Sequence, residues 1–324
     1  MKLLNFYNYK NLLKIGFSVN LLIIIFISII NKNYPDLDYE NINFAIIRRR
    51  DCLPCGLFSY YITYLGCINQ FINNGYVPIV DLKSFKNLLN GYVIDSSRTN
   101  PWELYFNQPF GYTLDNVLKK GKKIKFFECQ VNIFRPDNYI LFNKTILTFW
   151  HNVGLLYSPI KSEIIREANR IKKKLFKDSS NILGILMRGT DYLARKPPDH
   201  PILPSPDIVI NQIKEYDNKN KYDFFFIVTE DDLIRKLFIK QFPKKLKFIK
   251  TNKNLDYDYS KKLYLSDIKY IKGNIKFMKN YILNIIILSK CTDIICAITS
   301  GTLGVFIFNT KFRFEKIYNL GYYK

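Results

Sequence analysis

The stretch NILGILMRGTDY, residues 181–192, decides how the second half of the chain is interpreted. It begins as an uncharged, mostly aliphatic run of strand length and then passes into an arginine, a glycine and polar residues. The same order recurs in YDFFFIVTEDD, residues 222–232, and in TDIICAITSGT, residues 292–302. Such apolar runs are typical of strands buried on both faces of a parallel sheet. The pattern therefore predicts an α/β fold in which polar residues follow several strands.

Helical segments are expected between these strands. Apolar residues at helical spacing predict four β/α repeats of a doubly wound sheet. The expected strands span residues 181–187, 222–228, 246–250 and 292–298, and the expected helices span residues 207–216, 231–242, 274–289 and 301–309. Another helix is expected to begin at Ser158, because serine followed by Pro159 is a typical helix start. This helix would cross from the first half of the chain to the second.

A β-loop-α-β unit is also expected near the N-terminus. Residues 43–50 and 76–82 have strand character. The segment between them, from Gly56, has apolar residues at helical spacing and ends at Gly75. A crossover helix between two such strands implies parallel pairing. Little regular structure is predicted for residues 83–149.

The chain is long enough for two domains. With 324 residues and 48% hydrophobic content, each half can bury its own core. The pattern predicts two Rossmann-like domains facing a cleft, at residues 40–157 and 158–324. The net charge of +22 suits anionic partners and is spread along the chain. Because an AT-rich genome also produces a Lys- and Asn-rich chain, the charge is not used as functional evidence.

The N-terminal residues predict a membrane anchor. The uncharged run at residues 15–30, extended by Leu12 and Leu13, reaches spanning length, which is about 17–25 residues. No small-residue cleavage site follows, so an uncleaved signal anchor is expected at residues 12–30 within a tail of residues 1–34. The flanking charges favour a type II single-pass topology. The following domains would lie in a Golgi-like lumen in a eukaryote, or on the cytoplasmic face of the inner membrane in a bacterium.

Six cysteines leave the compartment open. Cys52 and Cys55 form a lone C-x-x-C, and with only two histidines in the chain a structural zinc site is not expected. In an oxidising lumen the cysteines would form disulfides, whereas buried thiols are the alternative. Residues 143–145 form a glycosylation sequon, which matters if the chain is lumenal.

Polar clusters follow three of the expected strands. In an open parallel sheet, ligands bind outside the carboxyl ends of the strands, so these clusters are expected to converge. The clusters are Arg188 with Thr190 and Asp191, then Thr229, Glu230 and Asp231, and finally Thr299, Ser300, Gly301 and Thr302. The last cluster opens a helix whose backbone N–H groups suit a phosphate, and an arginine opposite supplies a forked cation. The alternatives are structural: helix caps, and an ion pair between Arg188 and Asp191.

The motifs MRGTDY, FFFIVTEDD and LSKCTDIICAITSGT, in this order and spacing, resemble the conserved regions of the fucosyltransferase superfamily, which includes α1,2-, α1,6- and protein O-fucosyltransferases. GLFSYY, GYVPIVD and NPWELYFNQP nearer the N-terminus are similar to a less characterised branch. The resemblance covers nearly all of the chain after the expected anchor. It implies a GT-B fold with an acceptor-side first domain and a donor-side second domain. It also implies inverting, metal-independent transfer from a GDP-sugar, usually GDP-fucose, to a glycan or polysaccharide hydroxyl without a cofactor.

Carried over by position, the resemblance implies roles for several residues. Arg188 matches the family arginine that holds the β-phosphate, and Thr299 and Ser300 match the phosphate-binding turn. Asn284 falls where relatives often carry an aspartate that contacts the nucleoside. An arginine at position 188 suits this chemistry, because sugar transfer builds negative charge on the leaving diphosphate.

The acceptor hydroxyl needs a base nearby. Asp199 and His200, in the proline-rich loop after RGTDY, are the candidates, and a purely bracing role for His200 is the alternative.

Residues from the first domain are also expected at the cleft. Gly56 and Ser59 lie where a strand turns into a helix, and Gly56 lets a ligand approach the backbone. Trp102 and Glu103 are expected to line an acceptor groove, with a core position as the alternative for Trp102.

Other classes of protein fit the sequence less well. The D-x-D motifs at residues 36–38 and 256–258 do not follow strands, so a metal-dependent transferase is not expected. No G-x-G-x-x-G follows a strand, and basic residues are not gathered as nucleic-acid binding requires. Two positions depart from the family: Leu186 stands where histidine is common, and Gly189 where the α1,6 group has a second arginine. The alternative is therefore a non-catalytic glycan-binding or scaffold protein with a decayed donor site.

Overall fold

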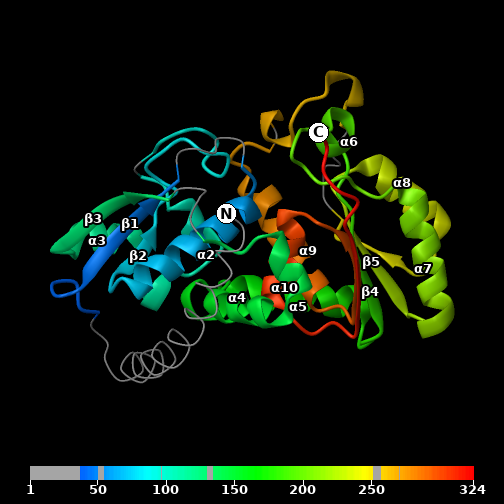
Figure 1. Cartoon of the computed structure of the whole chain (residues 1–324), viewed down its shortest axis with the longest axis horizontal. Coiled ribbons are helices and arrows are strands. Elements are labelled where there is room, and N and C mark those ends of the chain that lie inside the picture. Colours follow the sequence, from blue (N-terminus) through cyan, green and yellow to red (C-terminus); the bar gives the residue numbers. More distant parts are fainter. Residues whose placement is uncertain (1–36, 50–54, 96, 130–133, 251–256, 270) are drawn as a thin grey trace.

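The computed structural model describes residues 37–49, 55–95, 97–129, 134–250, 257–269 and 271–324. They form two sheets, with helices between the sheets and on the outer face of the larger one (Figure 1). The predicted α/β class with parallel sheets is confirmed. The expected anchor at residues 12–30 lies outside the described residues, and no described helix is long and apolar enough to span a bilayer. The domain boundaries stay predictions.

The first sheet has three parallel strands in the order β2-β1-β3. They are β1 (Asn43–Arg48), β2 (Val77–Val80) and β3 (Lys123–Glu128). Helix α2 (Leu57–Asn73) crosses from β1 to β2 and ends just before Gly75. Gly75 has a φ of 77°, a conformation that favours glycine, which explains why the helix stops there. The predicted β-loop-α-β unit is confirmed.

The region between residues 83 and 149 contains more regular structure than the sequence predicted. Its elements are η1 (Pro101–Leu104), η2 (Pro109–Gly111), α3 (Leu114–Lys120), β3, η3 (Asn138–Phe142) and most of α4 (Lys144–Tyr157). β3 has the sequence KIKFFE and none of its residues is buried. Because this edge strand lacks a continuous buried apolar run, its sequence does not show the strand signal.

The second sheet has five parallel strands in the order β6-β5-β4-β7-β8. Its strands are β4 (Ile182–Leu186), β5 (Phe224–Val228), β6 (Leu246–Lys247), β7 (Asp293–Ala297) and β8 (Phe314–Tyr318). Its helices are α5 (Ser162–Phe176), α6 (Asp191–Arg195), α7 (Pro206–Asn220), α8 (Asp232–Gln241), α9 (Ile275–Ser289) and α10 (Ser300–Phe308). The four predicted β/α repeats are present, and α6 and β8 are additions that the sequence pattern did not indicate.

The predicted helix start at Ser158 is wrong. Ser158 follows the last residue of α4, and α5 begins only at Ser162. The peptide between them is extended: Ile160 forms an isolated antiparallel bridge with Phe106, and the carbonyl of Pro159 accepts a hydrogen bond from the backbone N–H of Asn107 at 2.9 Å. Tertiary pairing with the loop after η1 therefore overrides the local helix-start signal.

Helices α4, α9 and α10 pack with α2 between the two sheets, while α7 and α8 lie on the far face of the second sheet (Figure 1). Phe58 on α2 is central to this packing. Its ring lies 5.3 Å from the ring of Tyr281 on α9 and 5.9 Å from that of Phe308 on α10. A Cβ added to Gly304 would lie 2.4 Å from the Phe58 ring, so α10 approaches α2 closely at this glycine.

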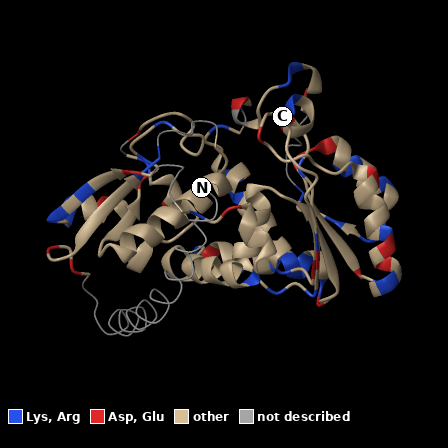
Figure 2. Cartoon of the chain, in the orientation of Figure 1, with Lys and Arg blue, Asp and Glu red and all other residues tan. Residues whose placement is uncertain are grey.

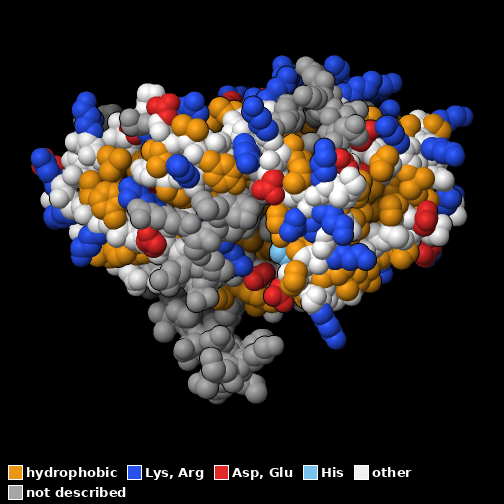
Figure 3. Space-filling model, turned by 90° about the horizontal axis from the view of Figure 1, so that it is seen from above, with side chains coloured by type: hydrophobic (Ala, Val, Ile, Leu, Met, Phe, Trp, Pro, Cys, Tyr) orange, Lys and Arg blue, Asp and Glu red, His pale blue; other side chains and the backbone are white. Residues whose placement is uncertain are grey.

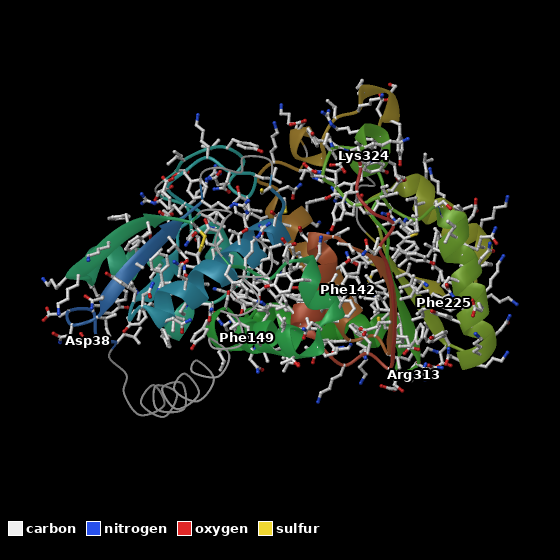
Figure 4. All side chains as sticks on the ribbon, viewed as in Figure 1. Asp38, Phe142, Phe149, Phe225, Arg313 and Lys324 are labelled. Atoms are coloured by element: carbon white, nitrogen blue, oxygen red, sulfur yellow. A yellow bond between two sulfur atoms is a disulfide. The ribbon has the colours of Figure 1, made fainter. Side chains whose placement is uncertain are left out.

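The two edges of the second sheet differ in character. Figure 4 shows Arg313 at the amino edge and Lys324 at the opposite edge. Arg313 Nη2 lies 2.5 Å from Asp293 Oδ2, and Asp293 is fully buried. Tyr222 Oη donates a second hydrogen bond to this carboxylate. At the amino edge a buried carboxylate is thus paired with a half-exposed arginine, and open polar groups are to be sought at the carboxyl edge.

Lysines and arginines are distributed over both halves of the described chain rather than gathered on one element (Figure 2). The face seen from above carries them scattered among hydrophobic side chains (Figure 3). This distribution differs from the single basic face that nucleic-acid binding requires.

One disulfide joins the two layers of the first half. Cys67 on α2 is bonded to Cys129, just after β3, with the two Cα atoms 6.2 Å apart. Cys55 is also disulfide-bonded. Cys291 and Cys296 are free and buried. Both alternatives left open by the sequence therefore occur, each in a different part of the chain.

Candidate functional site

Arg188 lies two residues beyond β4, at the carboxyl edge of the second sheet. Its Nη2 donates a hydrogen bond to Asp191 Oδ1 at 2.9 Å, and its Nε lies 3.6 Å from Glu230 Oε1. The centre of the guanidinium lies 4.8 Å from the ring of Tyr192. Burial alone would lower the pKa of Arg188, but the negative charges of Glu230 and Asp191 raise it above its usual value. The side chain is therefore charged and held in one position.

The contacts of Arg188 leave part of the guanidinium free. Nη1 makes no hydrogen bond to any described residue, and Nε is buried without a hydrogen-bond partner. The Arg188 side chain is 28% exposed. An arginine fixed by carboxylates on one edge can thus still donate to an anion on the other.

The turn that carries Arg188 is held by side chains from the end of β5. Gly189 donates its backbone N–H to Glu230 Oε1 at 2.8 Å, and Thr190 donates its own to Asp231 Oδ2 at 3.1 Å. These bonds fix Thr190 at a φ of 47°, which is uncommon for a residue other than glycine. Asp231 also caps α8, and Thr229 Oγ1 accepts a hydrogen bond from the backbone N–H of Asp231 at 3.1 Å.

The structural alternatives from the sequence are thus present at the first two clusters. The carboxylates pair with Arg188 and with backbone N–H groups, and Asp231 is a helix cap. Donor contacts of Thr190, Asp191, Thr229, Glu230 and Asp231 stay predictions.

The third cluster opens α10. Thr299 Oγ1 accepts a hydrogen bond from the backbone N–H of Thr302 at 3.1 Å, and Thr302 Oγ1 donates one to the carbonyl of Ala297 at 2.5 Å. The backbone N–H groups of Ser300 and Gly301 make no hydrogen bond to the described residues, as expected for the first turn of a helix. These two N–H groups, together with the helix dipole, suit an anion.

Tyr281 connects these clusters, although no sequence motif contained it. A Cβ added to Gly301 would lie 2.6 Å from Tyr281 Oη and 3.7 Å from Leu186 at the end of β4. Burial raises the pKa of Tyr281, while the charge of Arg188 lowers it and that of Glu230 raises it. The hydroxyl therefore lies beside the N-terminus of α10 and within electrostatic reach of the arginine. A lone tyrosine in an apolar helix gave no signal in the sequence.

The candidate bases lie in a loop that the C-terminal residues fasten. Tyr323 exchanges two backbone hydrogen bonds with this loop: its carbonyl accepts from Asp199 at 3.0 Å, and its N–H donates to His200 at 2.9 Å. Asp199 is exposed and has a φ of 59°. His200 packs edge-on against Tyr192, at a centroid distance of 5.2 Å. Since the Tyr192 ring also contacts Arg188, His200 and the arginine pack against the same side chain.

The hydrogen bonding of His200 fixes its tautomer. Nδ1 lies 2.9 Å from the carbonyl oxygen of Pro198. A carbonyl can only accept, so Nδ1 carries the hydrogen and Nε2 of the neutral ring keeps its lone pair.

The predicted residues of the first domain divide into two groups. Gly56 precedes α2 and is exposed, with no atom within 4 Å of an added Cβ, and Ser59 lies one turn further on. The nearby Phe58–Tyr281 contact places this end of α2 close to α9. Trp102, in contrast, is fully buried against Tyr61 and its neighbours, so its expected place in an acceptor groove is wrong.

Glu103 and Asn284 have structural contacts. Glu103 Oε1 accepts hydrogen bonds from the backbone N–H of Leu114 at 2.7 Å and from Gln108 Nε2 at 2.9 Å. These bonds join the loops around η1. Asn284 lies one turn after Tyr281 on α9, and its amide donates to the carbonyl of Asn280 at 2.9 Å. Its expected contact with the nucleoside stays a prediction.

Comparison with known proteins concerns the fold. Neither a protein-family model nor a curated protein matches the sequence. The crystal structure of POFUT1 in complex with GDP is 10% identical and matches 87% of this chain and 99% of the POFUT1 chain, with a TM-score of 0.50. The chain has the fold of POFUT1. Because the match covers 87% of this chain, it extends over both sheets rather than one.

Two structures of NodZ are similar at lower scores. Fucosyltransferase NodZ from Bradyrhizobium is 13% identical and matches 82% of this chain and 92% of its own, with a TM-score of 0.46. NodZ α-1,6-fucosyltransferase soaked with GDP-fucose is 12% identical and matches 83% of this chain and 93% of its own, also with a TM-score of 0.46. At these identities, the relation to POFUT1 describes the fold and leaves the activity to be argued from the site.

Proposed function

We propose that the chain is a glycosyltransferase of GT-B architecture that transfers a sugar, with fucose favoured, from a GDP-sugar to a hydroxyl of a glycan or polysaccharide. The observation that carries the proposal is the position of Arg188. Its guanidinium is fixed by two carboxylates and a ring, keeps free donors, and shares the carboxyl edge of the sheet with the open N-terminus of α10. The fold of POFUT1, which was crystallised with GDP, and the resemblance of MRGTDY and AITSGT to fucosyltransferase motifs support the same donor.

The proposed chemistry is a single inverting displacement without a metal. The acceptor oxygen forms a bond to the anomeric carbon while the bond from that carbon to the diphosphate oxygen breaks. His200 Nε2 takes the proton of the acceptor hydroxyl, which its tautomer permits. The leaving diphosphate gains negative charge, and Arg188 Nη1 with the N–H groups of Ser300 and Gly301 stabilises it. Because these donors are already in place, they need little reorganisation in the transition state.

We also propose that the catalytic domains face an oxidising lumen, held by an anchor at residues 12–30. The disulfide between Cys67 and Cys129 supports this choice, since disulfides persist in oxidising compartments and are rare in the cytosol. A cytoplasmic location in a bacterium is the competing proposal.

One observation favours a second function. The pairing of Arg188 with Asp191 and Glu230 is also what a structural brace would look like. Together with the family departures at Leu186 and Gly189, it supports a glycan-binding or scaffold protein without turnover. For Gly189 the structure gives a separate reason for the departure, because a Cβ there would lie 2.4 Å from Asp231 Oδ2.

The test is a titration of the full chain, purified in detergent, with GDP-fucose, GDP-mannose, and UDP- and CMP-sugars by calorimetry. We expect a GDP-sugar to bind and to be turned over slowly, and Arg188→Ala to lose about two to three decades of turnover. The variant should remain folded, with an unfolding midpoint lowered by the loss of the ion pairs with Asp191 and Glu230. Arg166→Ala, which removes an exposed arginine hydrogen-bonded to Ser162 in the first turn of α5, is the matched control. Folded wild-type protein that binds no nucleotide sugar would reject the transferase. Turnover that survives Arg188→Ala would reject the assigned site.

A further inference from the structure

Tyr281 on α9 contacts both α10 and α2 beside the proposed site. Its hydroxyl lies over Gly301 at the start of α10, and its ring packs edge-on against Phe58 from α2 at 5.3 Å and 86°. The fit of Phe58 against Gly304 leaves the Phe58 ring little freedom. The orientation of Tyr281 is thus set from both neighbouring helices, α2 and α10.

The hydroxyl of Tyr281 has hydrogen-bonding capacity that the protein does not use. It makes no hydrogen bond to any described residue, whereas the hydroxyl of Thr299 caps α10 and the hydroxyl of Thr302 donates to the carbonyl of Ala297. Burial raises the pKa of Tyr281, so the phenol is protonated and can donate at neutral pH. An unengaged donor held over Gly301, at the open N-terminus of α10 and within electrostatic reach of Arg188, is suited to an anion.

We propose that Tyr281 Oη donates a hydrogen bond to the diphosphate of the donor nucleotide, between Arg188 and the N-terminus of α10. This inference rests on the proposed function. It assigns to α9 a contact with the diphosphate, whereas the family resemblance places the phosphate contacts at Arg188 and at the start of α10. Phe58 acts as a positioning residue, because it holds the Tyr281 ring without reaching the ligand itself.

The experiment compares Tyr281→Phe with wild type in calorimetric titrations with GDP and with guanosine. The substitution keeps the ring and its contact with Phe58 and removes only the hydroxyl. A hydrogen bond donated to a charged group predicts about 10-fold or greater weakening of GDP binding, with guanosine binding unchanged. Tyr64→Phe is the control, because Tyr64 is also buried but packs from α2 against Trp102 rather than against α10. We expect it to bind GDP as wild type does.

The outcomes separate the two proposals. Equal GDP affinity of Tyr281→Phe and wild type would overturn the inference and leave the transferase proposal standing. Equal weakening of GDP and guanosine would also overturn it, because the hydroxyl would then support the fold rather than the diphosphate. Failure of wild type to bind GDP would overturn both.

Discussion

Replacement of Gly189 by alanine tests how tightly the Arg188 turn is built. The added Cβ would lie 2.4 Å from Asp231 Oδ2 and 2.7 Å from Asp231 Cβ, both far shorter than van der Waals contact. Asp231 is only 1% exposed, and it cannot move without losing its bonds to the N–H groups of Leu233 and Thr190. A lost cap costs about 1 kcal/mol, and overpacking costs about 1–3 kcal/mol. We therefore expect Gly189→Ala to lower the free energy of unfolding by about 2–4 kcal/mol.

Urea unfolding followed by circular dichroism measures this loss, with Gly56→Ala as the matched control. Gly56 has a φ of −75° and nothing within 4 Å of an added Cβ, so its replacement should change the stability by less than about 0.5 kcal/mol. Equal unfolding free energies for the two variants would refute the packing described around Asp231.

Three further predictions concern the compartment, one disulfide and the cap of α10. In a secretory host, Thr145→Ala should remove one glycan, seen as a mobility shift, while leaving the cap that Asn143 makes at 3.2 Å with Ile146; an unglycosylated wild type would count against the lumenal proposal. The disulfide between Cys67 and Cys129 closes a separation of 62 residues, so replacing both cysteines by serine should lower the free energy of unfolding in urea by about 4 kcal/mol. An unchanged free energy of unfolding would mean that this bond is absent. Thr299→Ala should cost about 1 kcal/mol in the same unfolding assay, whereas Thr299→Ser should cost less, because serine keeps the cap of α10; equal losses would contradict the capping role.

Four strands of the second half could be located along the chain because most of their apolar runs are continuous and buried. β5 and β7 lie in the interior of the sheet, where both faces are covered, so their sequences carry no polar alternation. β3 is the counter-example: it lies at an edge of the first sheet, its side chains are exposed, and its sequence resembles a polar segment. The helix start predicted at Ser158 was wrong for a different reason, since pairing between distant segments decides the local conformation there.

The candidate site could be predicted in part for a similar reason. Arg188 and Thr299 follow strands, and parallel topology brings the ends of strands together. What the sequence could not indicate is which polar atoms are already used. Glu230 accepts a hydrogen bond from the turn that carries Arg188, and Trp102 is buried in the core. The hydroxyl of Tyr281, in contrast, has no hydrogen-bond partner among the described residues. Hydrogen-bond satisfaction is a property of three-dimensional packing, so it appears only in the structure.

The central claim is that the diphosphate of a GDP-sugar binds between Arg188 and the start of α10. A crystal structure of the full chain with GDP, in the absence of added metal, tests it most directly. The account predicts a phosphate oxygen within about 3 Å of Arg188 Nη1 and of the backbone N–H of Ser300 or Gly301. GDP bound elsewhere on the molecule, with Arg188 still paired only to Asp191 and Glu230, would contradict it.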